Sequence, residues 1–178
     1  MVPATPSPDL PPTPRRSRWA RCCAYRLLLL LAGSTFALDQ ASKAWIAAHL
    51  PFPTYGGPAT VIVIRGFFNL VHVGNTGAAW SMFSGASVLL AGLAAATLVA
   101  IFIWRHSLGL RDRLSQISFG LLCGGIVGNL TDRLLHGHVI DFVDLHFGSY
   151  IYPTFNIADS GICVGVILYL WQSLRAPR

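Results

Sequence analysis

The sequence predicts a mainly α-helical membrane protein with four transmembrane helices and a small extracytoplasmic β-sheet between the first two. Hydrophobic residues make up 53% of the 178 residues and charged residues 11%, less than half of the roughly 25% that is usual in soluble domains. Four apolar stretches are each long enough to cross about 30 Å of hydrocarbon, which takes roughly 20 helical residues. The loop between the first two stretches is rich in β-branched residues, which favour strands.

The four predicted spans cover residues 25–49, 86–104, 114–135 and 155–174. An even number of spans places both termini on the same side of the membrane. Of the 13 lysines and arginines, ten lie on the terminal side and three on the other side, namely Lys43, Arg65 and Arg133. Since basic residues concentrate on the cytoplasmic side, we expect both termini to be cytoplasmic. The net charge of +6 follows from this topology, and arginines that flank apolar spans disfavour nucleic-acid binding.

The chain divides into three parts. Residues 1–24 form a Pro/Arg-rich tail that we expect to be disordered, because six of the eleven prolines fall in its first fourteen residues. Residues 25–174 form the membrane domain, and residues 175–178 form a short C-terminal tail. Within the segment 56–80 of the membrane domain, Arg65 and Gly66 separate a β-branched run, residues 60–64, from a second strand-forming run, residues 67–73, which predicts short strands. Such strands are not stable alone, so we expect them to rest on the helices or on the membrane surface.

All seven acidic residues are aspartates, and five of them lie on the predicted outer side: Asp39, Asp132, Asp141, Asp144 and Asp159. An ionisable residue in a membrane segment costs several kcal/mol and marks a functional site by default. Asn129 and Asp132 on the third span have the same spacing as Asn156 and Asp159 on the fourth. Arg133 shares the face of Asn129. We therefore expect one polar cluster at the outer edge of the membrane.

Glycines every four residues predict how the two clusters come together. Gly120, Gly124 and Gly128 form such a stripe on the third span, and Gly161 and Gly165 form one on the fourth. Small residues at this spacing let helix backbones approach closely in lipid. We therefore expect the third and fourth spans to pack together, with Asp141 on the connection between them. Dimerisation through the same stripes is the alternative.

Two carboxyl groups held close together in a low dielectric cannot both ionise, so one of them keeps a proton. The ionised group can then activate a water molecule while the protonated one polarises a carbonyl. A simpler interpretation is that Asp132 pairs with Arg133, while Asn129 and Asn156 satisfy helix ends. A proton-linked transporter could use the same acids as a relay, although the second and fourth spans offer no polar path to the cytoplasm. An assembly factor would explain the hydrophobicity but not the paired Asn-x-x-Asp motifs.

The histidines and cysteines do not have the spacing of metal ligands. Three histidines near the predicted site, His136, His138 and His146, form no HExxH-type pair. The four cysteines show no paired metal-ligand spacing either. We therefore expect neither a metal ion nor a cofactor.

Four sequence blocks resemble, in order, the signature blocks of the lipoprotein signal peptidases (signal peptidase II). They are residues 39–43 (DQASK), 75–80 (NTGAAW), 124–133 (GGIVGNLTDR) together with 139–142 (VIDF), and 155–160 (FNIADS). The resemblance covers residues 25–174 and implies an aspartic endopeptidase of the bacterial cytoplasmic (inner) membrane. Such enzymes remove the signal peptide of diacylglyceryl-modified prolipoproteins just before the lipidated cysteine.

The resemblance also implies roles for individual residues. The catalytic pair of the family falls on Asp141 and Asp159, near the outer leaflet. Its substrate-binding and support positions fall on Asp39, Asn75, Gly77, Asn129, Asp132, Arg133 and Asn156. The segment 56–80 corresponds to the β-cradle of the family, and Gly74 stands where a bulkier residue is expected. The implied partners are the lipid-modified prolipoprotein and membrane lipid, and we expect a monomer.

Overall fold

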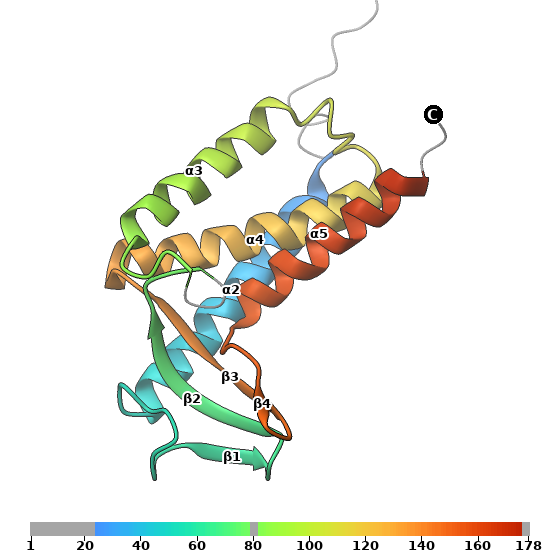
Figure 1. Ribbon diagram of the computed structural model, residues 1–178. Coiled ribbons are helices and arrows are strands. Elements are labelled where there is room, and N and C mark those ends of the chain that lie inside the picture. The colour runs from blue at the N-terminus through green and yellow to red at the C-terminus, as the bar shows by residue number, and fades with distance from the viewer. Residues whose placement is uncertain (1–23, 79–81, 176–178) are drawn as a thin grey trace, which may run out of the picture.

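The computed structural model describes residues 24–78 and 82–175 (Figure 1). The predicted tail, apart from Ala24, therefore lies outside the described residues, as does Trp80. In the described part of the chain the helices are α2 (Arg26–His49), α3 (Ser87–Ile103), α4 (Arg113–His136) and α5 (Ile157–Arg175). The strands are β1 (Val61–Ile64), β2 (Phe68–Asn75), β3 (Val139–Phe147) and β4 (Tyr150–Ile151).

Each predicted span coincides with one helix, and the boundaries agree to within two residues. Among the described residues, α4 and α5 are both long enough and apolar enough to cross a membrane, whereas α3 is shorter at 17 residues. α4 has well-defined ends: the Asp112 carboxylate accepts from the N–H groups of Leu114 and Ser115, and Gly137 closes the helix with φ 75°. Asp112 and Gly137 are thus an N-cap and a left-handed C-cap.

The helix α4 runs between α2 and α5, while α3 diverges from these three (Figure 1). The predicted role of the glycine stripe on α4 is only partly right. A Cβ atom at Gly124 would come within 2.6 Å of the Ala32 carbonyl oxygen on α2, whereas one at Gly125 would collide with the Ala158 carbonyl oxygen on α5. At Gly165 a Cβ atom would approach the Ser118 carbonyl oxygen to 2.5 Å. Because α4 is the central helix, its small residues admit a neighbour on each of two faces.

The strands form one antiparallel sheet in the order β1-β2-β3-β4. The sequence predicted a sheet formed by the segment between the first two spans, but only β1 and β2 come from that segment. β3 and β4 come from the connection between α4 and α5 and complete it (Figure 1).

Packing at the end of α2 joins this sheet to the helices. Ile46 and Leu50 near the end of α2 pack with Ile140 and Phe142 of β3 in the hydrophobic core. The sheet therefore packs on the end of α2 through β3. This packing brings Asp141 to the end of the bundle where α4 ends and α5 begins.

Candidate active site

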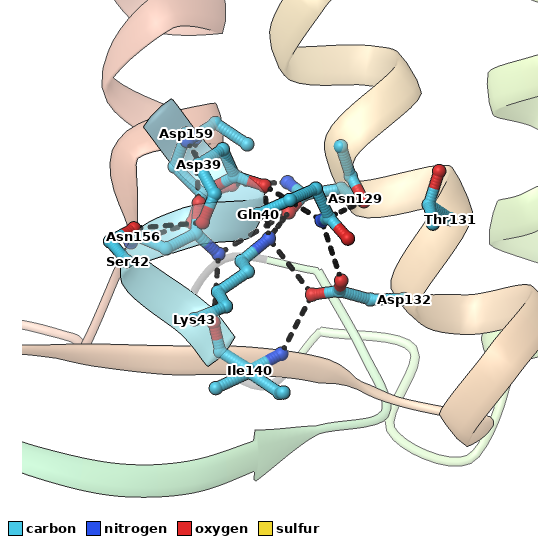
Figure 2. Close-up of polar contacts among 12 residues, drawn as sticks. Asp39, Gln40, Ser42, Lys43, Asn129, Thr131, Asp132, Ile140, Asn156 and Asp159 are labelled. Atoms are coloured by element: carbon cyan, nitrogen blue, oxygen red, sulfur yellow. Dashed lines mark hydrogen bonds and ion pairs between the residues drawn. The ribbon is translucent and has the colours of Figure 1, made fainter. Parts of the chain in front are cut away.

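A buried lysine joins α2 to α4. Lys43 Nζ lies 2.7 Å from Asp39 Oδ2, 2.8 Å from Asp132 Oδ2 and 3.0 Å from Asn129 Oδ1. Figure 2 shows the Lys43 side chain reaching these groups from α2. Lys43, Asp39 and Asp132 are each at most 2% exposed. A buried charge is tolerated only when it is paired and hydrogen-bonded, so these three residues form one interdependent unit.

Gln40, Asp39 and Asp132 extend this unit to the neighbouring elements. Gln40 Nε2 donates to Asp132 Oδ1 at 3.0 Å. Asp39 Oδ1 accepts from the backbone N–H of Ala158 at 2.8 Å, which satisfies one of the open donors at the start of α5. Asp132 Oδ2 accepts from the backbone N–H of Ile140 at 3.1 Å. This bond fixes the position of β3 at the residue directly before Asp141.

Arg133 does not pair with Asp132, which corrects the simpler interpretation drawn from the sequence. Its Nη2 donates to the carbonyl oxygen of Gly77 at 2.9 Å, and its Nη1 donates to the carbonyl oxygen of Asn129 at 3.3 Å. The side chains of Asp132 and Arg133 leave α4 in different directions because the two residues are adjacent in the helix. The Asp132 carboxylate is paired with Lys43 instead. The Nε atom of Arg133 is buried and has no hydrogen-bond partner among the described residues.

Asn156 and Asp159 cap the start of α5 reciprocally. Asn156 Oδ1 accepts from the backbone N–H of Asp159 at 2.9 Å, and Asp159 Oδ2 accepts from the backbone N–H of Asn156 at 3.3 Å. This is the geometry of a capping box with an asparagine at the cap. Asn156 therefore satisfies a helix end, as the simpler interpretation held, and it also fixes the position of the Asp159 carboxylate.

Asn156 also reaches Asp141, so it bridges the two aspartates. Its Nδ2 donates to Asp141 Oδ1 at 2.7 Å, while Asn75 Nδ2 donates to Asp141 Oδ2 at 3.0 Å. Burial, followed by the negative charge of Asp159, raises the pKa of Asp141 to about 7. The hydrogen bonds from Asn75 and Asn156 and the charge of Lys43 oppose this rise. Asp141 can therefore keep its proton near neutral pH.

Asn129 connects the buried lysine with Asp159. Its Oδ1 accepts from Lys43 Nζ at 3.0 Å and from Asn156 Nδ2 at 3.3 Å. Both contacts require an oxygen acceptor, so they fix which end of the Asn129 amide is the oxygen. The Asn129 Nδ2 group therefore points to Asp159 and donates to its Oδ1 at 2.7 Å. The lysine thus acts on Asp159 through Asn129.

A cavity of about 640 Å³ opens beside these groups. Asn75, Gly77, Asn129, Arg133 and Asp159 supply its polar wall. The remaining wall is mostly apolar and includes Val139, Leu145, Ile162, Cys163 and Val164. Asp141 is 1% exposed and lies behind its partners Asn75 and Asn156. An apolar pocket with a few converging polar groups is the usual form of an active site.

The structure brings together the proposed catalytic and support residues: Asp39, Asn75, Gly77, Asn129, Asp132, Arg133, Asn156, Asp141 and Asp159. Asp144 is apart from them, because its Oδ2 accepts from Asn69 and lies 2.7 Å from His146 Nε2. The sequence reasoning did not assign roles to Gln40 and Lys43, although both lie in a signature block. The sequence does contain a signal for the role of Lys43: it follows Asp39 by four residues, which is the spacing of an ion pair within a helix.

The departure at Gly74 is explained by its neighbours. A Cβ atom at this position would lie 2.7 Å from His138 Cδ2 and 3.0 Å from Phe52 Cζ. The rings of Phe52 and His138 are stacked with centroids 5.4 Å apart. These two rings therefore fill the space that a side chain at position 74 would take.

No group of three or more His, Cys, Asp or Glu residues in the described ranges is arranged to hold a metal ion. His138 stacks on Phe52, and His146 contacts Asp144. The expectation that the enzyme needs no metal stays a prediction and is tested below.

The chain is similar to known proteins in both sequence and structure. A family model described as signal peptidase (SPase) II matches residues 31–175. The lipoprotein signal peptidase of Xylella fastidiosa (strain M12) is 40% identical over 158 residues, which cover 84% of this chain and 92% of that protein. The lipoprotein signal peptidase of Azoarcus sp. (strain BH72) is 40% identical over 161 residues, which cover 84% of both proteins.

A solved structure has the same fold. It is described as a bacterial membrane enzyme determined by the in meso method at 2.3 Å resolution. It is 32% identical in sequence, has a TM-score of 0.75, and the match covers 83% of this chain and 87% of the other. The resemblance inferred from the four sequence blocks is therefore confirmed. The chain belongs to the signal peptidase II family, whose members are proteases of the aspartic type.

Proposed function

We propose that this enzyme cleaves the signal peptide of diacylglyceryl-modified prolipoproteins just before the lipidated cysteine, with Asp141 and Asp159 as its catalytic pair. The observation that carries the proposal is the bridge that Asn156 makes between these two aspartates. The chemical step needs one proton shared by two carboxyl groups, and the pKa of about 7 at Asp141 supports this at neutral pH.

In the proposed mechanism, the pair activates one water molecule against the scissile carbonyl. The carboxylate takes a proton from the water, and the protonated group donates a hydrogen bond to the carbonyl oxygen. The buried side chains hold the pair in place: Asn75 and Asn156 bind Asp141, while Asn129 binds Asp159. Because the two carboxyl groups titrate together, the proton belongs to the pair rather than to either residue.

Arg133 has a different proposed role. Its two terminal nitrogens hold the carbonyl oxygens of Gly77 and Asn129, whereas its Nε donor is unused within the described chain. Arg133 lines the cavity beside Asp159. We infer that the guanidinium positions the Gly77 segment and binds a backbone carbonyl of the substrate. Asn75 lines the same cavity and uses one N–H of its amide on Asp141, and we infer that its second N–H binds a substrate carbonyl as well.

The proposed membrane placement follows from the charges and the helices. The four helices cross the inner membrane, both termini are cytoplasmic, and the catalytic pair lies near the outer leaflet. Two features support this: the ten-to-three distribution of basic residues, and the position of the site at the polar end of α2. The substrate enters sideways from the bilayer with its acyl chains in lipid, and one monomer contains the complete site.

Cleavage of a synthetic lipidated prolipoprotein peptide by the purified enzyme tests the proposal. Cleavage before the lipidated cysteine, with no effect of a chelator, is expected. Asp141→Asn and Asp159→Asn should each abolish cleavage while leaving expression and membrane insertion intact. The double variant should be scarcely worse than either single one, because groups that act as a unit are non-additive. Substantial turnover by Asp141→Asn, or inhibition by a chelator that added metal reverses, would overturn the mechanism.

A further inference from the structure

A second cavity of about 450 Å³ lies next to the first. The two cavities share four lining residues, Asn75, Tyr152, Pro153 and Thr154. These residues therefore form a common border, with one cavity on each side. The second cavity has the size of a ligand pocket, and the catalytic chemistry described above makes no use of it.

The two cavities meet close to the catalytic pair, at the residue that holds Asp141. Asp159 lines the first cavity. Val73 lines the second, and Val73 is the residue that faces Asp141 across the β2–β3 ladder. Asn75 borders both cavities and donates its hydrogen bond to Asp141. An extended chain that passes from the first cavity to the second therefore passes Asp159 and then Asn75, the residue that holds Asp141.

The walls of the two cavities differ in chemistry. The first extends along the apolar residues Ile162 and Val164 of α5. The second is lined largely by hydroxyl and amide groups, namely those of Tyr55, Asn75, Thr76, Ser84, Tyr152 and Thr154.

Two of these hydroxyl groups are available to a ligand. Within the described ranges, the hydroxyls of Tyr55 and Thr154 make no hydrogen bond to protein atoms. The second cavity can therefore supply partners for the N–H and C=O groups of a peptide backbone.

We propose that the second cavity binds the polypeptide segment that directly follows the lipidated cysteine of the substrate. This inference rests on the proposed function and adds a binding site for the mature side of the cut. The physical reason is that the signal peptide is apolar and stays in the bilayer, whereas the chain after the cysteine leads into water. Its backbone polar groups need partners wherever they leave water, and the second cavity provides them.

Crosslinking locates the two sides of the substrate directly. The full-length Asp141→Asn variant binds two lipidated prolipoprotein peptides, each with one photoreactive residue, without cutting them. A crosslinker three residues after the cysteine should label Tyr55 or Thr76, which line the second cavity but not the first. One placed four residues before the cysteine should label Ile162 or Val164. A reversed pattern, or labelling of the first cavity by both peptides, would overturn the proposal.

Kinetics give an independent test. Two substrates are compared with the active enzyme: one ends in an amide at the lipidated cysteine, and the other continues for four polar residues. Tyr55→Phe combined with Thr154→Val should raise KM for the longer substrate about thirtyfold, since two hydrogen bonds of about 1 kcal/mol each are lost. For the short substrate, KM should stay unchanged. Tyr169→Phe and Thr97→Val, which line neither cavity, are the matched controls.

The outcomes separate this inference from the proposed function. If the wild-type enzyme cleaves neither substrate, the proposed function fails. If it cleaves both, but the double variant changes KM equally for both or for neither, the proposed function stands and the second cavity does not bind the mature segment.

Discussion

Replacing Asp141 with asparagine should abolish cleavage and also change how stability depends on pH. In the unfolded chain the Asp141 carboxyl loses its proton near its ordinary pKa of about 4, whereas in the folded protein its pKa is about 7. Between these values the folded state binds more protons than the unfolded state, so stability falls as pH rises. The loss is complete slightly above pH 7, where the buried carboxyl is ionised in both states.

The size of this effect follows from the two pKa values. A difference of about three units corresponds to about 4 kcal/mol at roughly 1.4 kcal/mol per unit. Asparagine does not titrate, so the variant does not lose this free energy of unfolding as the pH rises. It presents an NH₂ group to one of the donors Asn75 and Asn156, however, and one unmet hydrogen bond costs about 1–3 kcal/mol. Asp141→Asn should therefore be less stable than the wild type near pH 4 and more stable near pH 8.

Thermal unfolding of both proteins in the same detergent, followed at several pH values, measures the difference. The unfolding midpoint of the variant relative to the wild type should rise by roughly 10 °C between about pH 4 and about pH 8. Asp112→Asn is the matched control, because hydrogen bonds, chiefly from the N–H of Ser115, lower the pKa of Asp112. Its stability relative to the wild type should stay nearly constant between about pH 4 and about pH 8, and it should change in the opposite direction only below about pH 4. A pH-independent difference for Asp141→Asn would refute the argument that burial keeps this carboxyl protonated.

Three further predictions concern the buried network, the helix packing and the topology. Asp132→Asn should reduce both activity and stability, the latter by about 3–5 kcal/mol, because it removes one partner of the buried Lys43; wild-type thermal stability and turnover would contradict this. Gly125→Ala should destabilise the protein and lower its unfolding midpoint, because its Cβ would collide with a carbonyl oxygen of α5, whereas Gly33→Ala has open space and should not; equal midpoints would remove the packing argument. A reporter fused after residue 178 should be cytoplasmic and one near residue 57 external, and an external C-terminus would exclude the four-span topology.

Much of the helical architecture could be predicted from the sequence, because local composition determines it. The apolar stretches have helical length, and the structure has a helix at each of them. The Asn-x-x-Asp motif of residues 156–159 is a local signal in the same sense, since its capping box involves only neighbours along the chain. The signature blocks likewise identified the family from residue order alone.

The sheet and the ion-pair partners required the tertiary structure, because they depend on contacts between distant segments. Pairing of β2 with β3 joins two loops that α3 and α4 separate in the sequence. Lys43 lies 89 residues before Asp132, yet it is Lys43 that pairs with that carboxylate, while the adjacent Arg133 binds the Gly77 carbonyl. The sequence could show which charged groups are present, but a buried charge is satisfied by whichever partner the packing brings within hydrogen-bond distance. That choice is made by the packing of α2, α4, α5 and β3 around one polar centre.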